Sequence, residues 1–334
     1  MRFGLFGGAR VGQAGPSDSQ GYENFVQYVV EAEELGFESL FLVEHHFTGI
    51  GQVSSSLSLL AYLAAKTSKI RLGTGVVVLP WHNPVLVAEQ AATLDLLSNG
   101  RLDLGVGRGY RKPEFDGFCV PMEEAQERFD EAVEVIRKAW TSAGRFSHHG
   151  KRWNYDNIVV EPPVRQYPHP PMWLGAVSAD SIRRAAREGY NLLLDQVASV
   201  AEVGERIGIF REECERVGRA YQSHMVGVTR GLYLAQTGEE RARQAARRVE
   251  ILATIGGIRR PGLGDPDQDD SPLFGTPAEI IARVRELEQV GVGLLLASDP
   301  GGDLQALRTF GREVMPAFAA ASAAQAQPAV AEPA

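Results

Sequence analysis

The side chains best suited to chemistry in this 334-residue sequence stand directly after short apolar runs. One run ends in Val43-Glu44-His45-His46-Phe47, where a histidine of near-neutral pKa can accept or donate a proton. Neighbouring strand residues point to opposite faces, so the two histidines are a poor metal chelate. Two interpretations stand for His45, a proton-handling group or a structural histidine packed at the strand end. Glu44 either orients a histidine or ends the strand.

Glycines mark two further strand ends. The run from Gly73 to Leu79 has glycine among β-branched residues, which indicates either close approach of a ligand or tight interior packing. The run Gly105-Val106-Gly107-Arg108-Gly109 lacks the G-x-G-x-x-G spacing and the helix start of a dinucleotide site. Small residues beside one arginine suit a phosphate, which a guanidinium can bind with two hydrogen bonds. The alternative is a surface arginine in a glycine turn.

A fourth strand end opens a helix at Val177-Ser178-Ala179-Asp180-Ser181. Free N–H groups at a helix start, with serine hydroxyls beside them, favour phosphate binding. The simpler interpretation is that Ser178 caps the helix, and one serine can do both. Asp180 would repel a phosphate, so we expect its side chain to face solvent.

Composition excludes several classes of protein. A formal net charge of −8 argues against nucleic-acid binding, and no apolar run approaches the ~18 residues of a membrane-spanning helix. Two distant cysteines exclude a disulfide framework and favour a reducing compartment, so we expect a cytoplasmic protein. No zinc spacing, P-loop or G-x-S-x-G elbow is present, and we expect no metal.

The elements that position these residues alternate between strand and helix. Helical spacing of apolar residues predicts helices, and β-branched runs predict strands. Eight strands, each followed by a helix, predict an α/β protein with a TIM (β/α)8 barrel, whose active site lies at the carboxyl ends of the strands. The predicted strands are 2–7, 39–43, 70–79, 102–106, 172–176, 190–194, 226–235 and 292–297. Asn83 before Pro84 predicts a helix start, and Thr276 with Glu279 predicts a capping box at another. Residues 303–318 are expected to form the last helix, and residues 111–114 are expected as loop.

Three segments break the alternation. Residues 145–165 predict a hairpin insertion, and residues 256–275 predict a long loop rich in Gly, Pro and Asp, which favours a functional role. We expect a single barrel domain over residues 1–318. The Ala-rich residues 319–334 are expected to form a disordered tail.

The sequence resembles the bacterial luciferase-like family of flavin-dependent monooxygenases. The matching segments occur in family order and cover about nine-tenths of the chain. They are F-L-V-E-H-H-F-T, L-G-T-G-V-V-V-L-P-W-H-N-P-V, L-L-S-N-G-R-L-D-L-G-V-G-R-G-Y with P-E-F-D-G-F, and F-G-T-P-A-E with V-M-P. The resemblance implies a TIM barrel, FMN at the carboxyl ends of the strands, and a dimer.

The resemblance also assigns roles to individual residues. His45 matches the histidine beside the flavin, which assists proton movement and stabilises a flavin C4a-peroxide. Gly75 and Val76 match a pair joined by a non-prolyl cis peptide against the isoalloxazine. The phosphate is implied to bind to Arg108, Ala176, Val177, Ser178 and Ser181.

Departures from luciferase limit what the resemblance implies. Val177 stands where luciferase has glutamate, although the backbone N–H at that position can still serve. Gly107 replaces a reactive cysteine, Gln196 replaces a tryptophan, and the 256–275 loop is shorter than the mobile lid. Neither the substrate pocket nor light emission is therefore carried over, and we expect a dark monooxygenase.

We therefore expect an FMN-dependent monooxygenase that oxygenates a small organic substrate with O₂. A separate flavin reductase supplies reduced FMN, because no NAD fingerprint is visible. The substrate pocket is expected above the flavin, the 256–275 loop closes over it, and the chain forms a homodimer. Two alternatives are an F420-dependent dehydrogenase and a non-catalytic flavin-binding protein. The E-H-H-F segment resembles the FMN branch of the family more than the F420 branch. The residues expected to line the pocket are Phe6, Phe47, Tyr110 and Gln196.

Overall fold

Eight parallel strands close into a barrel within the part of the chain that the computed structural model describes, residues 1–10, 19–49, 52–255, 262–265, 268–299 and 302–319. Their order around the barrel follows the sequence, and β9–β10 and β12–β1 pairings complete the ring. The predicted TIM barrel is confirmed. The strands are β1 Arg2–Gly7, β2 Ser39–Leu42, β3 Arg71–Thr74, β5 Leu102–Gly107, β8 Met172–Gly175, β9 Asn191–Leu194, β10 Val226–Leu234 and β12 Leu294–Ser298.

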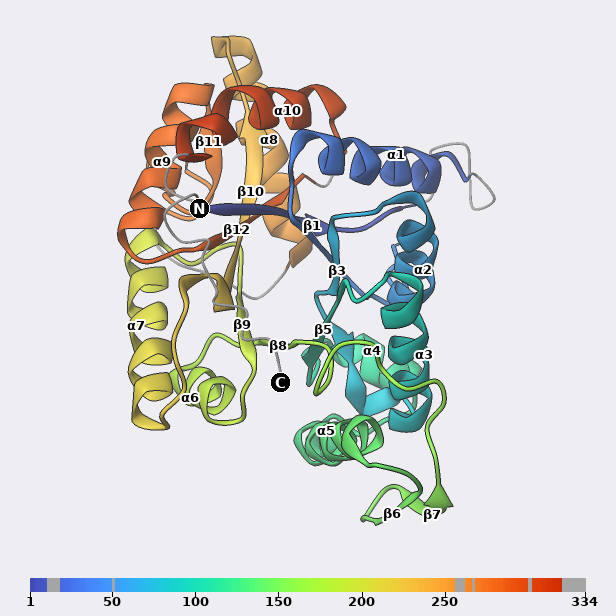
Figure 1. Cartoon of the computed structure of the whole chain (residues 1–334). Coiled ribbons are helices and arrows are strands. Elements are labelled where there is room, and N and C mark those ends of the chain that lie inside the picture. The colour runs from blue at the N-terminus through green and yellow to red at the C-terminus, as the bar shows by residue number, and fades with distance from the viewer. Residues whose placement is uncertain (11–18, 50–51, 256–261, 266–267, 300–301, 320–334) are drawn as a thin grey trace, which may run out of the picture.

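Helices cover the outside of this barrel (Figure 1). Local signals set several of their ends: Gly36 closes α1 at a φ of 95°, and the Asn83 side chain caps α3. Thr276 and Glu279 form the predicted capping box of α9. The helices are α1 Gln20–Leu35, α2 Ser56–Lys66, α3 Pro84–Leu97, α4 Lys112–Gly117, α5 Ala125–Thr141, α6 Ala179–Arg187, α7 Val200–Arg216, α8 Gly238–Ile255, α9 Pro277–Gln289 and α10 Leu304–Thr309.

Successive side chains of a strand point alternately into the barrel and away from it, which produces two apolar clusters. One contains residues of the barrel strands only and fills the interior, whereas the other packs the outer faces of the strands against the helices. Glycine is needed where interior strands crowd: a Cβ on Gly105 would lie 1.8 Å from the Thr74 carbonyl oxygen. The interior cluster consists of Phe41, Trp173, Leu193, Leu294 and Leu296, with Phe6 and Val76 packed against it.

Two predicted elements differ from the structure near the barrel's carboxyl end. The predicted strand 70–79 is split into β3 and β4 Val77–Val78, and it ends in a 3-10 turn, Leu79–Trp81. The interruption falls at Gly75-Val76, whose peptide bond is cis. Residues 111–114, expected as loop, begin α4, because Pro113 fits the first turn of a helix and so marks a start there rather than a break.

Other differences lie in the insertions and at the carboxyl terminus. The predicted hairpin is confirmed as β6 Phe146–His149 and β7 Asn154–Ile158, which lies beyond α5 in Figure 1. Within 256–275, β11 Leu273–Gly275 pairs with β10, and three residues are too short a run to be recognised in the sequence. The predicted helix 303–318 is found as α10, which continues as a π-helical turn, Phe310–Val314, and then a 3-10 turn, Met315–Phe318. The division at residue 319 stays a prediction, since 320–334 lie outside the described residues.

Candidate active site

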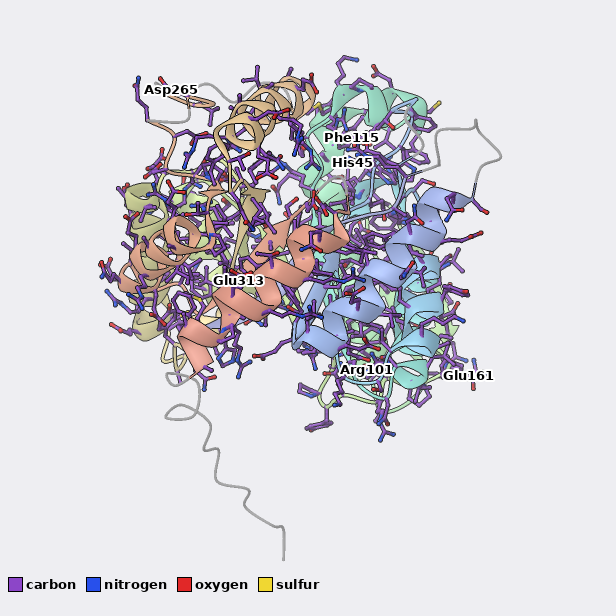
Figure 2. The ribbon with its side chains drawn as sticks, turned by 90° about the horizontal axis from the view of Figure 1, so that it is seen from above. His45, Arg101, Phe115, Glu161, Asp265 and Glu313 are labelled. Atoms are coloured by element: carbon purple, nitrogen blue, oxygen red, sulfur yellow. The ribbon has the colours of Figure 1, made fainter. Side chains whose placement is uncertain are left out.

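The residues predicted from the sequence gather at one end of the barrel, called here the mouth. They lie at or just after the carboxyl ends of six strands that are consecutive neighbours, β1, β2, β3, β5, β8 and β9. In Figure 2, His45 lies beside Phe115 of α4, whereas Arg101, which precedes β5, lies on the other side of the molecule. The predicted site residues of the mouth are Phe6, His45, Phe47, Gly75, Val76, Arg108, Tyr110, Ala176, Val177, Ser178, Ser181 and Gln196.

His45 is held by a glutamate that the sequence did not point to. Its Nδ1 lies 3.1 Å from Oε1 of Glu114, a buried residue of α4, and the same oxygen accepts the His46 backbone N–H at 3.1 Å. Burial lowers the pKa of His45 below its usual value, although the Glu114 carboxylate acts in the opposite direction. The histidine therefore favours its neutral form. The only sequence signal for Glu114 was its place in the segment P-E-F-D-G-F.

Glu44 orients the other histidine. Its Oε1 is 3.3 Å from Nε2 of His46 and 2.9 Å from Nε2 of His82, and its Oε2 accepts a hydrogen bond from Ser56. Burial raises the pKa of Glu44, but the hydrogen bonds from the two histidines outweigh burial and lower the pKa to about 2. Of the two roles considered for Glu44, the structure shows that it orients His46 and not His45.

Two glycines of the mouth are packed against side chains. The cis peptide between Gly75 and Val76, implied by the resemblance, is confirmed. The Phe6 ring lies 2.9 Å from where a Cβ on Gly75 would stand, and Val76 Cγ2 lies 2.5 Å from such an atom on Gly107. Gly75 is half-buried and Gly107 is buried, so these glycines leave room for Phe6 and Val76.

Arg108 and the start of α6 form a site suited to an anion. Strand pairing sets Val106 of β5 beside Leu174 of β8, and Arg108 and Ala176 each follow two residues later, just beyond the ends of these neighbouring strands. Arg108 is exposed, and its one hydrogen bond within the described residues is a 3.5 Å contact to Gln126. Because that partner is uncharged, the guanidinium remains available to a phosphate.

The serines of this site are arranged as a helix cap. Ser178 Oγ accepts the Ser181 N–H at 3.3 Å and lies 2.9 Å from Ser181 Oγ. The expected orientation of Asp180 is confirmed, since its side chain is fully exposed and pairs with Arg183. Capping and phosphate binding are compatible, because the first backbone N–H groups of the helix are not used by the cap. These residues fit a phosphate group.

The predicted pocket residues are not all in contact with one another. Phe6 packs with Val76 in the interior cluster, but the Phe47 ring lies against Gly117 and Phe118 of the α4 segment. Tyr110 is 66% exposed and Gln196 is half-buried. Among the described residues, the ring contacts of Phe47 are to His46 and Phe118 and not to the other three side chains.

The described residues contain no group of three or more His, Cys, Asp or Glu side chains placed to hold a metal ion. They also contain no helix with both the length and the apolarity needed to cross a bilayer.

A closed parallel barrel with polar side chains at the carboxyl ends of its strands places the chain among the (β/α)8 enzymes, whose active sites lie at that end. The family model "Luciferase-like monooxygenase" matches residues 1–294. The chain belongs to the luciferase-like monooxygenase family, a family of flavin-binding proteins.

Similar proteins from three organisms illustrate this membership. An uncharacterized protein, y4vJ of Sinorhizobium fredii, is 33% identical over 218 residues, 65% of this chain and 62% of the relative, which is less than two thirds of that relative's length. The oxygenase component of a flavin-dependent trigonelline monooxygenase from Acinetobacter baylyi is 29% identical over 255 residues, 75% of this chain and 70% of the relative. The crystal structure of monooxygenase RslO1 from Streptomyces bottropensis matches with a TM-score of 0.85 at 27% identity, covering 95% of this chain and all of that one.

Proposed function

We propose that this protein is an FMN-dependent monooxygenase that uses O₂ to oxygenate a small organic substrate such as an aldehyde, ketone or hydrocarbon. The observation that carries the proposal is the gathering of His45, the Gly75-Val76 backbone and the Arg108–Ser178 anion site at one mouth. The relative named as an oxygenase component supports a separate flavin reductase as the source of reduced FMN.

Each part of the mouth has a role in this proposal. Bound FMN supplies the activation of O₂, which protein side chains alone do not provide. Its phosphate would be held by Arg108, by the Ser178 and Ser181 hydroxyls, and by the backbone N–H groups from Ala176 and Val177 onward. The backbone at Gly75-Val76 would contribute to the flavin site, and His45 would hold or move a proton at Nε2. The route through the flavin C4a position stays a prediction.

The loop over residues 256–275 is proposed to close over the mouth and exclude water. Residues 256–261 and 266–267 lie outside the described residues. The described part is anchored at its base, since Arg248 of α8 donates hydrogen bonds to Asp269 and Ser271.

An absorbance titration with FMN, reduced FMN and F420, followed by an oxygen-electrode assay with a flavin reductase, tests the proposal. We expect binding of reduced FMN and O₂ consumption that yields oxygenated product. Hydride transfer to or from F420 without O₂ consumption would identify a dehydrogenase instead. Flavin binding without any O₂-dependent turnover would identify a non-catalytic flavin-binding protein.

Replacing His45 with alanine tests the histidine. Loss of a general acid–base group lowers turnover by roughly 10²–10⁴-fold, so coupled turnover of His45→Ala should fall in this range. FMN binding should remain measurable, because the anion site is on other strands. Product formation and FMN affinity are measured side by side, and unchanged turnover would remove His45 from the proposed chemistry.

We also propose that the chain is a cytoplasmic homodimer. The free thiols of Cys119 and Cys214 fit a reducing compartment. Large apolar side chains are exposed on the packed helices α2 and α3: Tyr62 is 54%, Leu86 55% and Leu97 63% exposed. Such side chains are typical of a surface that a second subunit covers. Sedimentation velocity should give twice the chain mass, and Leu86→Arg with Leu97→Arg should give a monomer.

A further inference from the structure

Two buried glutamates lie beside the adjacent histidines of the mouth, and each contacts a different one. Glu114 contacts Nδ1 of His45, whereas Glu44 contacts Nε2 of His46 and of His82. We propose that Glu114 is the positioning residue of the active site: it accepts the Nδ1 proton of His45 and so presents the unprotonated Nε2 to the barrel mouth. The catalytic use of Nε2 rests on the proposed function, but the positioning itself does not.

The backbone holds the Glu114 carboxylate in place independently of the His45 ring. Oε1 of Glu114 accepts the His46 backbone N–H at 3.1 Å, which ties it to the chain that continues β2. The same oxygen is 3.1 Å from His45 Nδ1, although the two residues are 69 positions apart. A carboxylate only accepts hydrogen bonds, so His45 must carry its proton on Nδ1 to make this contact. One ring nitrogen bonded in this way sets the role of the other.

An arginine completes the arrangement. Arg111 Nη1 is 3.4 Å from His45 Nδ1 and 3.8 Å from Glu114 Oε1. A guanidinium only donates, so a hydrogen bond from Arg111 to Nδ1 would require that nitrogen to be unprotonated and would exclude donation from Nδ1 to Glu114. The Glu114 contact is the shorter of the two, 3.1 Å, and favours the Nδ1–H form. The positive charge of Arg111 balances Glu114 and disfavours a second positive charge on the imidazole. The charged groups that act on His45 are thus Glu114 and Arg111, which contact its ring, and Glu44, which acts through its charge alone.

These groups act on the pKa of His45 in opposite directions. Burial, the largest effect, lowers this pKa and Arg111 lowers it further, whereas Glu114 and Glu44 raise it. The net direction is downward, so near neutral pH the imidazole is uncharged and Nε2 carries a lone pair. No hydrogen bond to Nε2 is found within the described residues.

A proton balance follows from this arrangement. When Nε2 takes a proton from a group in the mouth, His45 becomes an imidazolium whose charge Glu114 balances while remaining ionised. When Nε2 returns that proton, the neutral Nδ1–H form is restored. Glu114 therefore keeps the ring orientation and tautomer through both steps without exchanging a proton itself.

Nitrogen-15 NMR of histidine-labelled, FMN-free protein tests the positioning directly. The sequence has seven histidines, and the His45 signals are assigned by their absence in His45→Asn. We expect His45 to be protonated on Nδ1 and unprotonated on Nε2 in the wild type. Glu114→Gln should give a mixture of tautomers, because an amide can either accept or donate. An unchanged Nδ1–H population in Glu114→Gln would overturn the proposal.

Glu44→Gln is the matched control. It removes the charge of an equally buried glutamate beside the neighbouring histidine, but it leaves the Glu114 contact in place. The His46 and His82 signals should change while the His45 tautomer is retained. A loss of the His45 tautomer equal to that in Glu114→Gln would show a general effect of lost buried charge, and would overturn the specific role.

The pH profile of turnover is a second test. If Glu114 had only a structural role, Glu114→Gln and Arg111→Met would not shift the acidic limb of this profile in opposite directions. Turnover needs neutral His45, so it declines as pH falls through the pKa of His45. Glu114→Gln removes a group that raises this pKa, so its acidic limb should move to lower pH, with maximal turnover roughly 10²-fold below wild type. Arg111→Met removes a group that lowers the pKa, so its limb should move to higher pH.

Shifts in the same direction for the two variants would contradict the proposal. Should Glu114→Gln fail to fold, the shift of the folded Arg111→Met variant and the tautomer of Glu114→Asp decide the question, since Glu114→Asp keeps the charge. If the wild type shows no O₂-dependent turnover, the proposed function fails while the NMR measurement still decides whether Glu114 positions His45.

Discussion

Arginines at the two ends of the barrel have opposite surroundings. Arg101, just before β5, donates hydrogen bonds to the backbone carbonyls of Ser98 and Ile70 and to the Thr67 hydroxyl, among others. Arg108, just after β5, is exposed and makes one 3.5 Å contact to Gln126. A single strand therefore carries a fully bonded arginine at its amino end and an available one at its carboxyl end.

The same contrast holds for other polar groups of the two ends. At the amino end, buried Asp103 accepts hydrogen bonds from Arg71 Nε at 2.6 Å and from Trp173 Nε1 at 3.1 Å. At the mouth, Arg108 and Ser178 are exposed. Polar groups that bond one another stabilise the fold, whereas groups left available can bind a ligand. Substitutions at the two ends should thus affect different measurements.

Asp103→Ala should have the largest effect, and it should act on stability. The variant leaves the buried Trp173 N–H without its acceptor and removes the charged partner of Arg71, so the free energy of unfolding should fall by roughly 3 kcal/mol. Urea unfolding measures the loss, and Asp103→Asn, which keeps one acceptor oxygen, should lose less. FMN affinity of the folded variant should stay near wild type. Wild-type stability with weakened FMN binding would contradict the comparison.

Arg108→Ala should act on ligand binding instead. A hydrogen bond to a charged group is worth about 1.5–3 kcal/mol, so the Kd for FMN should rise roughly 10- to 100-fold, with little change in unfolding free energy. Riboflavin, which lacks the phosphate, should bind both proteins equally. Arg183→Ala, at the paired and exposed arginine of α6, is the control. Equal losses for FMN and riboflavin would show that Arg108 does not contact the phosphate.

Gly107→Ala should have the smallest effect of the three substitutions. It tests the packing of Gly107 against Val76 within the mouth. The new Cβ would lie 2.5 Å from Val76 Cγ2. Overpacking of this kind costs roughly 1–3 kcal/mol, and Val76→Ala in the same chain should relieve most of it. Unfolding of the two single variants and the double variant gives the coupling free energy. Additive effects would show that the two side chains do not compete for one space.

Much of the fold was predictable because its signals are local. Apolar periodicity gave the eight strands, and Asn83 and Thr276 marked helix starts that the structure confirms. The segment 111–114 was expected as loop but begins α4, and β11 was not recognised. Those two elements are short, and short elements depend on packing against their neighbours more than on their own sequence.

The sequence by itself determined which residue types stand at the ends of the strands, because strand and helix periods are properties of neighbouring residues. Only the tertiary structure decided which of two glutamates contacts His45. Glu44 is adjacent in sequence but lies on the other face of the segment, whereas Glu114 reaches His45 from 69 positions away because β3 alone separates β2 from β5. Barrel closure creates such contacts, and they leave no periodic signal in the chain.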